Sequence, residues 1–152
     1  MTQGPAYNVR TPQVIAESLG YLMVQICKAH RNKAQELLAE IGLHVGQEML
    51  LMHLRIGDGL TQSELAEEIC VQPATLTRSL DRLSRSGLVE RRVDSEDQRV
   101  SRVYLTEAGR ALGQSIEQVW GELEALSFAN LTGEERVLLR RLLLQVYANV
   151  QE

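Results

Sequence analysis

The residues best suited to chemistry in this sequence are arginines, and they gather in one part of the chain. Between Gln72 and Arg110 every basic residue is an arginine, and these eight outnumber six acidic residues to give a net charge of +2. The remainder of the chain carries −6, so the whole protein is acidic at −4. Guanidinium groups make paired hydrogen bonds to phosphates and to guanine edges. An arginine-rich segment on an acidic body therefore indicates contact with a nucleic acid, although a solvated helix face has a similar composition.

A helix from Gln72-Pro73 to Ser86-Gly87 would position the first of these arginines. Proline fits the first turn of a helix because an N–H at that position has no helical partner. Leucines at 76, 80 and 83 share one face, which predicts that this face is buried. The other faces present the side chains that we expect to contact DNA, which are Gln72, Thr75, Thr77, Arg78 and Arg82. The alternative is that these five are ordinary solvated helix residues.

A shorter helix comes before it and completes a recognisable unit. Thr61 and Glu64 have the spacing of a capping box, which starts this helix. A short helix, a tight turn and a second helix form the helix-turn-helix unit. In such units the second helix enters the major groove of double-stranded DNA, where its N-terminal residues meet base edges. Double-stranded DNA is therefore the expected partner.

A β-hairpin is expected next, with strands at residues 88–93 and 100–105. The second strand alternates apolar and polar residues, and a charged loop, residues 94–98, joins the two. We expect a wing with a polar tip and not part of a core sheet. Arg99 is placed to reach the adjacent minor groove; alternatively it pairs with Asp94 or Asp97 and stiffens the wing. The other arginines of the hairpin are divided between phosphate contacts and solvent: Arg91, Arg92 and Arg102.

Long amphipathic helices are expected on both sides of this part of the chain. Apolar residues recur at helical spacing over residues 12–41, 106–129 and 137–150, and a mostly apolar helix is expected over 45–55. The first of them carries a seam with coiled-coil spacing at Ile15, Leu19, Leu22 and Ile26. The predicted fold class is mainly α with a small β-hairpin wing (α+β). A length of 152 residues is that of a single domain.

Several stretches of the sequence resemble the MarR family of winged helix-turn-helix regulators. They are LTQSELA from Leu60, QPATLTRSLDRL from Gln72, GLVER from Gly87, DSEDQR from Asp94 and VYLTEAG from Val103. The resemblance is specific over about residues 59–109. Outside that range it extends to helix order and length over nearly the whole chain.

The resemblance implies a sequence-specific transcriptional repressor that binds a short palindromic operator as a homodimer. It implies one domain over residues 1–152, with a DNA-binding lobe at about 43–109. A helical dimerisation lobe would comprise about residues 12–42 and 107–152, with the first and last helices intertwined. A wing acid often pairs with an arginine in this family, which implies a wing-stabilising role for Asp94 and Asp97. Small molecules or oxidants commonly relieve DNA binding in the family, so an effector is also implied.

The family's effector pockets lie between the two lobes. In this chain the residues that would line one are Tyr21, His30, Met49 and His53. The alternative is that each of the four is a packing or surface residue. The sequence alone gives no identity for the effector.

The two cysteines, Cys27 and Cys70, lie in helical and mostly apolar surroundings, so we expect buried free thiols. Cys27 and His30 share a helical face, but two ligands are too few for a metal site. His44 and His53 are the residues that could complete one, but no metal site is predicted. The peroxide-sensing branch of the family has its reactive cysteine near the start of the first helix. Gly20 stands there in this chain, so that mechanism is not supported.

The sequence lacks the signals of membrane proteins and of enzymes. Residues 1–12 are polar and lack an apolar signal core, and no run of eighteen apolar residues occurs, so we expect a cytoplasmic protein without a membrane span. No nucleophile–base pair, phosphate loop or zinc motif is present, so neither an enzyme nor a cofactor is expected. The main rival to a DNA-binding regulator is a winged helix that binds another protein.

Overall fold

The computed structural model describes residues 12–151; the polar segment before them, in which no signal core is expected, lies outside the described residues. The helices and strands follow in the order α1 (Gln13–Ala16), α2 (Leu19–Glu40), α3 (Gln47–Ile56), β1 (Leu60–Thr61), α4 (Gln62–Glu68), α5 (Pro73–Arg85), β2 (Val89–Val93), β3 (Ser101–Leu105), α6 (Glu107–Ala111), α7 (Gly113–Ser127) and α8 (Gly133–Gln151). This confirms the predicted fold class, which is mainly helical with a small antiparallel sheet.

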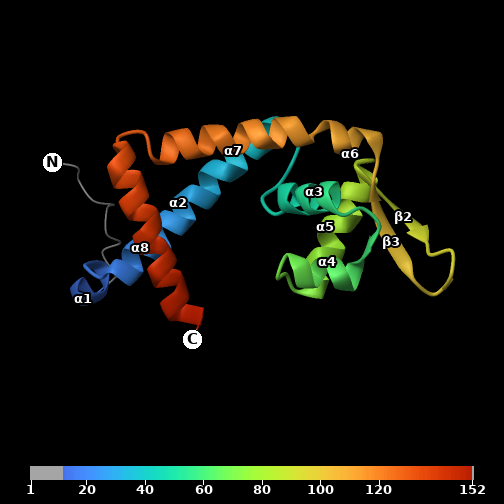
Figure 1. Ribbon diagram of the computed structural model, residues 1–152, viewed down its shortest axis with the longest axis horizontal. Helices are drawn as coiled ribbons and strands as arrows, with labels where there is room; N and C mark the ends of the chain where they lie inside the picture. Colours follow the sequence, from blue (N-terminus) through green and yellow to red (C-terminus); the bar gives the residue numbers. More distant parts are fainter. Residues whose placement is uncertain (1–11, 152) are drawn as a thin grey trace.

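The molecule has two ends that differ in shape (Figure 1). Helices α3, α4 and α5 gather with the sheet at one end, whereas α1, α8 and the first part of α2 form an open arrangement at the other. Helix α7 runs between the two ends, and α2 packs along it. Within residues 12–151, no helix is both long enough and apolar enough to cross a membrane.

The sheet has three strands in the order β1-β3-β2, and all neighbours are antiparallel. The hairpin of β2 and β3 was predicted, but β1 was not. Its two residues pair with β3 at Leu60↔Val103 and Thr61↔Arg102. The expectation that the hairpin lies outside the core is wrong for its base, because Val89, Val103 and Leu105 are buried. Only the part of the hairpin beyond this base is a solvent-exposed wing.

Helix α4 begins and helix α5 ends at the capping residues that the sequence predicts. The Thr61 side chain accepts from the Glu64 N–H (3.2 Å) and the Glu64 carboxylate accepts from the Thr61 N–H (2.7 Å), which confirms the capping box. Helix α5 ends before Gly87, whose φ of +70° is a backbone conformation that glycine adopts without strain. The Leu88 N–H then bonds back to the Leu83 carbonyl (2.9 Å), which closes the helix.

The two longest predicted helices are each interrupted in the structure. The expected helix over residues 12–41 breaks at Ser18, which has extended backbone angles and caps α2 by accepting from the Tyr21 N–H (3.1 Å). A serine oxygen competes well for a free N–H at such a position, so it starts a new helix. The expected helix over residues 106–129 divides at Leu112 into α6 and α7.

One continuous core joins the helix-turn-helix to the sheet. Its buried members come from α2, the loop after it, α3, α4, α5, β2, β3 and α7, and they include Leu38, Leu43, Leu50, Leu54, Leu65, Leu76, Leu80, Leu83, Val89, Val103 and Ile116. The leucines predicted for the inner face of α5 are thus confirmed as buried. Because interiors are close-packed, this contact fixes the rotation of α5 about its axis and decides which of its side chains face outward.

The cysteines do not match the expectation of buried thiols, because both are exposed. Cys70 follows the C-cap of α4 with a φ of +52°, in the left-handed turn that ends the helix, and this turn directs its side chain outward. Cys27 lies on a part of α2 where the neighbouring apolar side chains are themselves exposed. Apolar neighbours in the sequence therefore do not bury it within one chain.

Replacing Gly109 with alanine should destabilise the fold by about 1–3 kcal/mol, the usual cost of overpacking. Helix α6 passes so close to the start of β2 that a Cβ at this position would lie 2.1 Å from the Leu88 carbonyl oxygen. A backbone atom cannot move away as the end of a side chain can. The measurement is the urea midpoint of the purified variant.

Gly121→Ala is the matched control for that substitution. Gly121 lies within α7, and a Cβ added there meets nothing within 4 Å. Alanine is the better helix former, so this variant should be as stable as the wild type or slightly more stable. A Gly109→Ala variant with an unchanged urea midpoint would show that α6 can move away from β2 at little cost.

Candidate nucleic-acid interface

Helix α5 presents one buried and one exposed face. Leucines at 76, 80 and 83 hold the buried face, while Gln72, Thr75, Arg78 and Arg82 are exposed on the other side. The turn before α5 is closed by the Val71 N–H bonding to the Ala66 carbonyl (3.1 Å), which fixes how α5 leaves α4. The predicted polar set is therefore on the outward face of a firmly anchored helix.

The N-terminus of α5 is open toward solvent. Gln72 is the N-cap residue but makes no side-chain bond to the helix, and Pro73 occupies the first turn. The unpaired N–H groups and the helix dipole give this end a partial positive charge. Such an end favours a phosphate or the electronegative edge of a base.

Thr77 differs from the other outward residues because its hydroxyl is already engaged. It donates to the Pro73 carbonyl (2.9 Å) and accepts from Nε2 of Gln62 (3.4 Å). The second contact joins α5 to α4. Thr77 is exposed, but a base would have to compete with these two bonds for its hydroxyl.

The arginines of α5 and the sheet fall into two groups. Arg78 and Arg82 are exposed and make no hydrogen bond or ion pair to any side chain within residues 12–151. Others are engaged: Arg91 pairs with Asp81 (2.7 Å), and Arg92 pairs with Glu90 and lies 4.6 Å from the centre of the Tyr104 ring. Both are also exposed, so their expected contact with phosphates or solvent stays a prediction.

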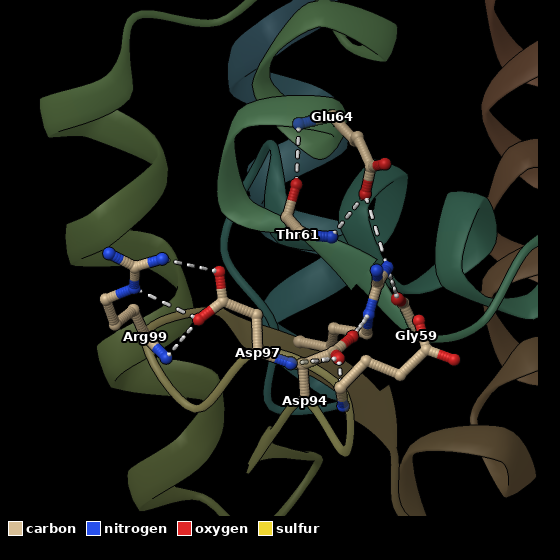
Figure 2. A network of polar contacts seen from close by, with 8 residues as sticks. Gly59, Thr61, Glu64, Asp94, Asp97 and Arg99 are labelled. Atoms are coloured by element: carbon tan, nitrogen blue, oxygen red, sulfur yellow. Dashed lines mark hydrogen bonds and ion pairs between the residues drawn. The ribbon is translucent and has the colours of Figure 1, made fainter.

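The tip of the wing is built around two aspartates (Figure 2). One oxygen of Asp94 accepts from the N–H groups of Glu96 (2.8 Å) and Asp97 (3.1 Å). Asp97 in turn accepts from the N–H of Arg99 (3.0 Å) and from its Nε (3.2 Å). The Arg99 side chain is 91% exposed, so the guanidinium is held at the tip while remaining accessible.

Arg102 completes this network, and sequence reasoning missed its role. Its Nε donates to the second oxygen of Asp94, and its Nη1 donates to the carbonyl of Gly59 (3.0 Å) and lies 3.7 Å from Glu64. The sequence assigned it to phosphate or solvent, which the structure contradicts. No signal within the hairpin identifies these partners, because two of them lie about forty positions earlier in the chain.

The electrostatics of this network keep Asp94 ionised. The hydrogen bond from Arg102, followed by the two backbone N–H groups, lowers the pKa of Asp94 from 3.8 to about 2. A carboxyl whose pKa is lowered by folding stabilises the fold fully above its unfolded pKa, near 3.8, and this contribution is lost as the pH falls through 2. The network is therefore intact throughout the neutral pH range.

The four residues predicted for an effector pocket are spread over two helices. Met49 and His53 lie one turn apart on α3, where Nδ1 of His53 is 2.9 Å from the Met49 carbonyl oxygen. His30 lies on α2 against the ring of Trp120, with ring centres 6.4 Å apart. Tyr21 is more than two helical turns before His30 on α2. Two cavities between or along α7 and α8 are lined by none of these four residues.

A metal centre has no support in the part of the chain that the structure describes. No group of three or more histidine, cysteine, aspartate or glutamate side chains there could hold a metal ion. Cys27 and Cys70 are both free thiols, one on α2 and the other after α4. The chemistry of the candidate site is therefore that of arginines, hydroxyls and a helix N-terminus.

A helix-turn-helix followed by a hairpin wing defines the chain as a winged helix-turn-helix protein. Comparison with known proteins narrows this class. A model of the MarR family matches residues 43–101. The multiple antibiotic resistance protein MarR of Escherichia coli (strain K12) is 32% identical over 129 residues, which are 84% of this chain and 90% of that protein. The chain therefore belongs to the MarR family.

Other relatives agree with this placement. The HTH-type transcriptional repressor NicR of Pseudomonas putida is 30% identical over 133 residues, which are 88% of this chain and 84% of that protein. The YdgJ regulator of Bacillus subtilis (strain 168) is 32% identical over 109 residues, which are 72% of this chain and 66% of that protein. A crystal structure of a mutant E. coli MarR complexed with operator DNA has a TM-score of 0.74 at 32% identity, covering 84% of this chain and 92% of that one. These relatives are named as regulators and not as enzymes.

Proposed function

We propose that this protein is a sequence-specific transcriptional repressor that binds a short palindromic operator as a homodimer and is released by a small-molecule effector. The observation that carries the DNA-binding part is the state of Arg78 and Arg82. Both are exposed on the anchored helix α5, and neither has an ion-pair partner within residues 12–151. An arginine without an internal partner needs no contact broken before it binds a phosphate or a base. A similar protein, a mutant E. coli MarR, has been solved in complex with operator DNA, which supports DNA binding by this chain.

The roles of the individual residues follow from their positions. Gln72, Thr75 and Arg78 would meet base edges or phosphates of the major groove from the first turns of α5. Arg82, in the last turn of the helix, would meet a phosphate or a base edge further along the same face. Arg99 would enter the adjacent minor groove from the tip of the wing. Asp94 and Asp97 would hold the wing in shape. Thr77 is less available to a base, because its hydroxyl already makes hydrogen bonds with the Pro73 carbonyl and the Gln62 side chain.

The homodimer is supported by the apolar surface of the open end. None of the residues of α8 is buried, yet its exposed side chains include Val137, Leu138, Leu142, Leu143, Leu144, Val146, Tyr147 and Val150. The predicted seam of α1 and α2 is exposed as well, with Leu19 80% and Ile26 56% accessible. An exposed apolar surface of this size is typical of an interaction site. We assign it to a second copy, so residues 12–42 and 107–152 form the dimerisation lobe and 43–109 the DNA-binding lobe of one domain.

The effector is the least constrained part of the proposal. Tyr21, His30, Met49 and His53 are half-buried or exposed, so none of the four is enclosed in the core of the single chain. His30 and its neighbour Trp120 lie where α2 crosses α7. A ligand bound there would contact both helices that connect the two ends of the molecule. We place the effector site at this crossing, next to α3.

Fluorescence anisotropy of the purified protein on DNA from just upstream of its own gene tests the function. We expect selective binding over an unrelated duplex of equal length. The affinity should fall steeply with salt, by about 10³–10⁵ between 50 and 200 mM if six to ten phosphates are contacted. A folded dimer that binds no DNA at any salt concentration would contradict the proposal and favour the protein-binding alternative.

A further inference from the structure

One guanidinium joins the wing to the body of the helix-turn-helix. Arg102 on β3 contacts Asp94 in the wing turn, and on its other side contacts the Gly59 carbonyl and approaches Glu64 (3.7 Å). Gly59 precedes β1, and Glu64 belongs to the capping box that starts α4. Arg102 is about one third exposed, so it is partly covered by these partners. The wing is therefore tied to the N-terminal end of α4 through this side chain.

A chain of short contacts then runs from Arg102 to the tip of the wing. Asp94, held by Arg102, receives the N–H groups of Glu96 and Asp97 and so sets the course of the turn. Asp97, fixed by that turn, receives both the backbone N–H and the Nε of Arg99. An ion pair at a 91% exposed side chain adds little stability. Its effect is on where the Arg99 guanidinium points.

We propose that Arg102 is a positioning residue, which fixes the wing relative to α5 and thereby sets where Arg99 meets the minor groove. The inference rests on the proposed DNA-binding function. It makes Arg102 a determinant of preference for the sequence flanking the operator. Narrow minor grooves of A·T tracts attract an inserted arginine, but only an arginine held at the right place can exploit the difference.

Arg92 provides a matched control on the neighbouring strand. It lies directly opposite Arg102 in the β2·β3 ladder, so removing either one changes the charge of the same cross-strand pair. Its own contacts are with Glu90 and the Tyr104 ring, and none reaches the wing turn. Arg92→Met therefore removes an equal charge from the same sheet while leaving the chain of contacts from Arg102 to Arg99 in place.

The test uses a palindromic duplex selected by the wild-type protein from a randomised library, in two versions with A·T or G·C flanks. Anisotropy should give tighter binding to A·T flanks for the wild type. Arg99→Ala should remove this preference, about tenfold in affinity. Arg102→Met should remove the preference to the same extent. The double variant Arg99→Ala/Arg102→Met should bind the operator no more weakly than the weaker-binding of the two single variants. Arg102→Lys should recover part of the preference by restoring a charge beside Asp94, and Arg92→Met should keep it in full.

One additional variant and two contradicting outcomes complete the test. Asp94→Asn breaks the same chain from the other side without changing side-chain size, and it carries the test if Arg102→Met does not fold. Arg102→Met and Asp94→Asn proteins that keep the flank preference, while Arg99→Ala loses it, would overturn the positioning role and leave the proposed function intact. An Arg99→Ala protein with wild-type affinity and preference would instead refute the wing contact of the proposed function, and the positioning role with it.

Discussion

Arg78→Ala should weaken binding to the operator by about 1–3 kcal/mol for each half-site, the usual value of an arginine that reads a base. Arg78 lies within the first turns of α5, exposed, on the side opposite the leucines that anchor the helix. The substitution should leave the fold unchanged because this exposed side chain makes no hydrogen bond or ion pair within residues 12–151. The loss should therefore appear in the complex alone. Anisotropy on the operator and on an unrelated duplex, with the thermal midpoint of each protein, measures it.

Arg85→Ala is the control for this substitution within the same helix. Arg85 is at the C-terminal end of α5, where its Nε bonds the Asp81 carbonyl oxygen (3.2 Å). It should affect the operator much less than Arg78→Ala does, because the first turns of the helix are those that enter the groove. A loss for Arg78→Ala that is equal on both duplexes would indicate a phosphate contact. An unchanged affinity for the operator would show that α5 is not the reading helix.

Local signals explain which parts of the fold the sequence predicts. The capping box at Thr61, the proline that starts α5 and the glycine that ends it act over a few residues, and each is found where expected. The leucine stripe of α5 is similarly reliable, because a period of 3.6 residues reports directly on the buried face of a helix. These signals suffice to define a helix-turn-helix.

Features that depend on distant partners were missed or misjudged. Strand β1 has two residues and exists because β3 pairs with it, more than forty positions later. The base of the hairpin is buried because α3 and α6 pack against β3, which the hairpin's own sequence does not reveal. The exposure of Cys27 has a related cause. A helical seam predicts that something covers it, but the same pattern serves a partner in the chain and a second chain equally.

The candidate site also contains residues that local sequence signals predict and residues whose roles depend on distant partners. The outward residues of α5 were found from periodicity, and a pairing of Arg99 with Asp97 was among the alternatives. Arg102 was assigned to phosphates or solvent although it is the residue that joins the wing to α4. Arginines on one strand look alike in sequence. The structure separates them by which acceptors the fold brings within reach, and these acceptors come from three different segments.

Leu142→Glu should convert the dimer to a monomer at micromolar concentration and lower operator affinity about 10²-fold or more. Leu142 lies in the middle of α8, a helix with no buried residue in the single chain. Burying a carboxylate without a partner costs several kcal/mol, and a twofold interface contains the change twice. Without a dimer, the two α5 helices no longer bind one palindrome together, so the gain from bivalent binding disappears. Sedimentation velocity gives the oligomeric state, and anisotropy gives the affinity.

Ile56→Glu distinguishes loss of an interface from the general effect of an added charge. Ile56 ends α3 and is 89% exposed, so it also carries an apolar side chain into solvent, but α3 lies at the sheet end of the molecule (Figure 1). This variant should remain dimeric. A Leu142→Glu protein that sediments as a dimer would remove α8 from the interface, and the apolar surface of the open end would then need a different cover. If Ile56→Glu also dissociates, an added carboxylate away from α8 is enough to break the dimer, and the Leu142→Glu result would no longer assign the interface to α8.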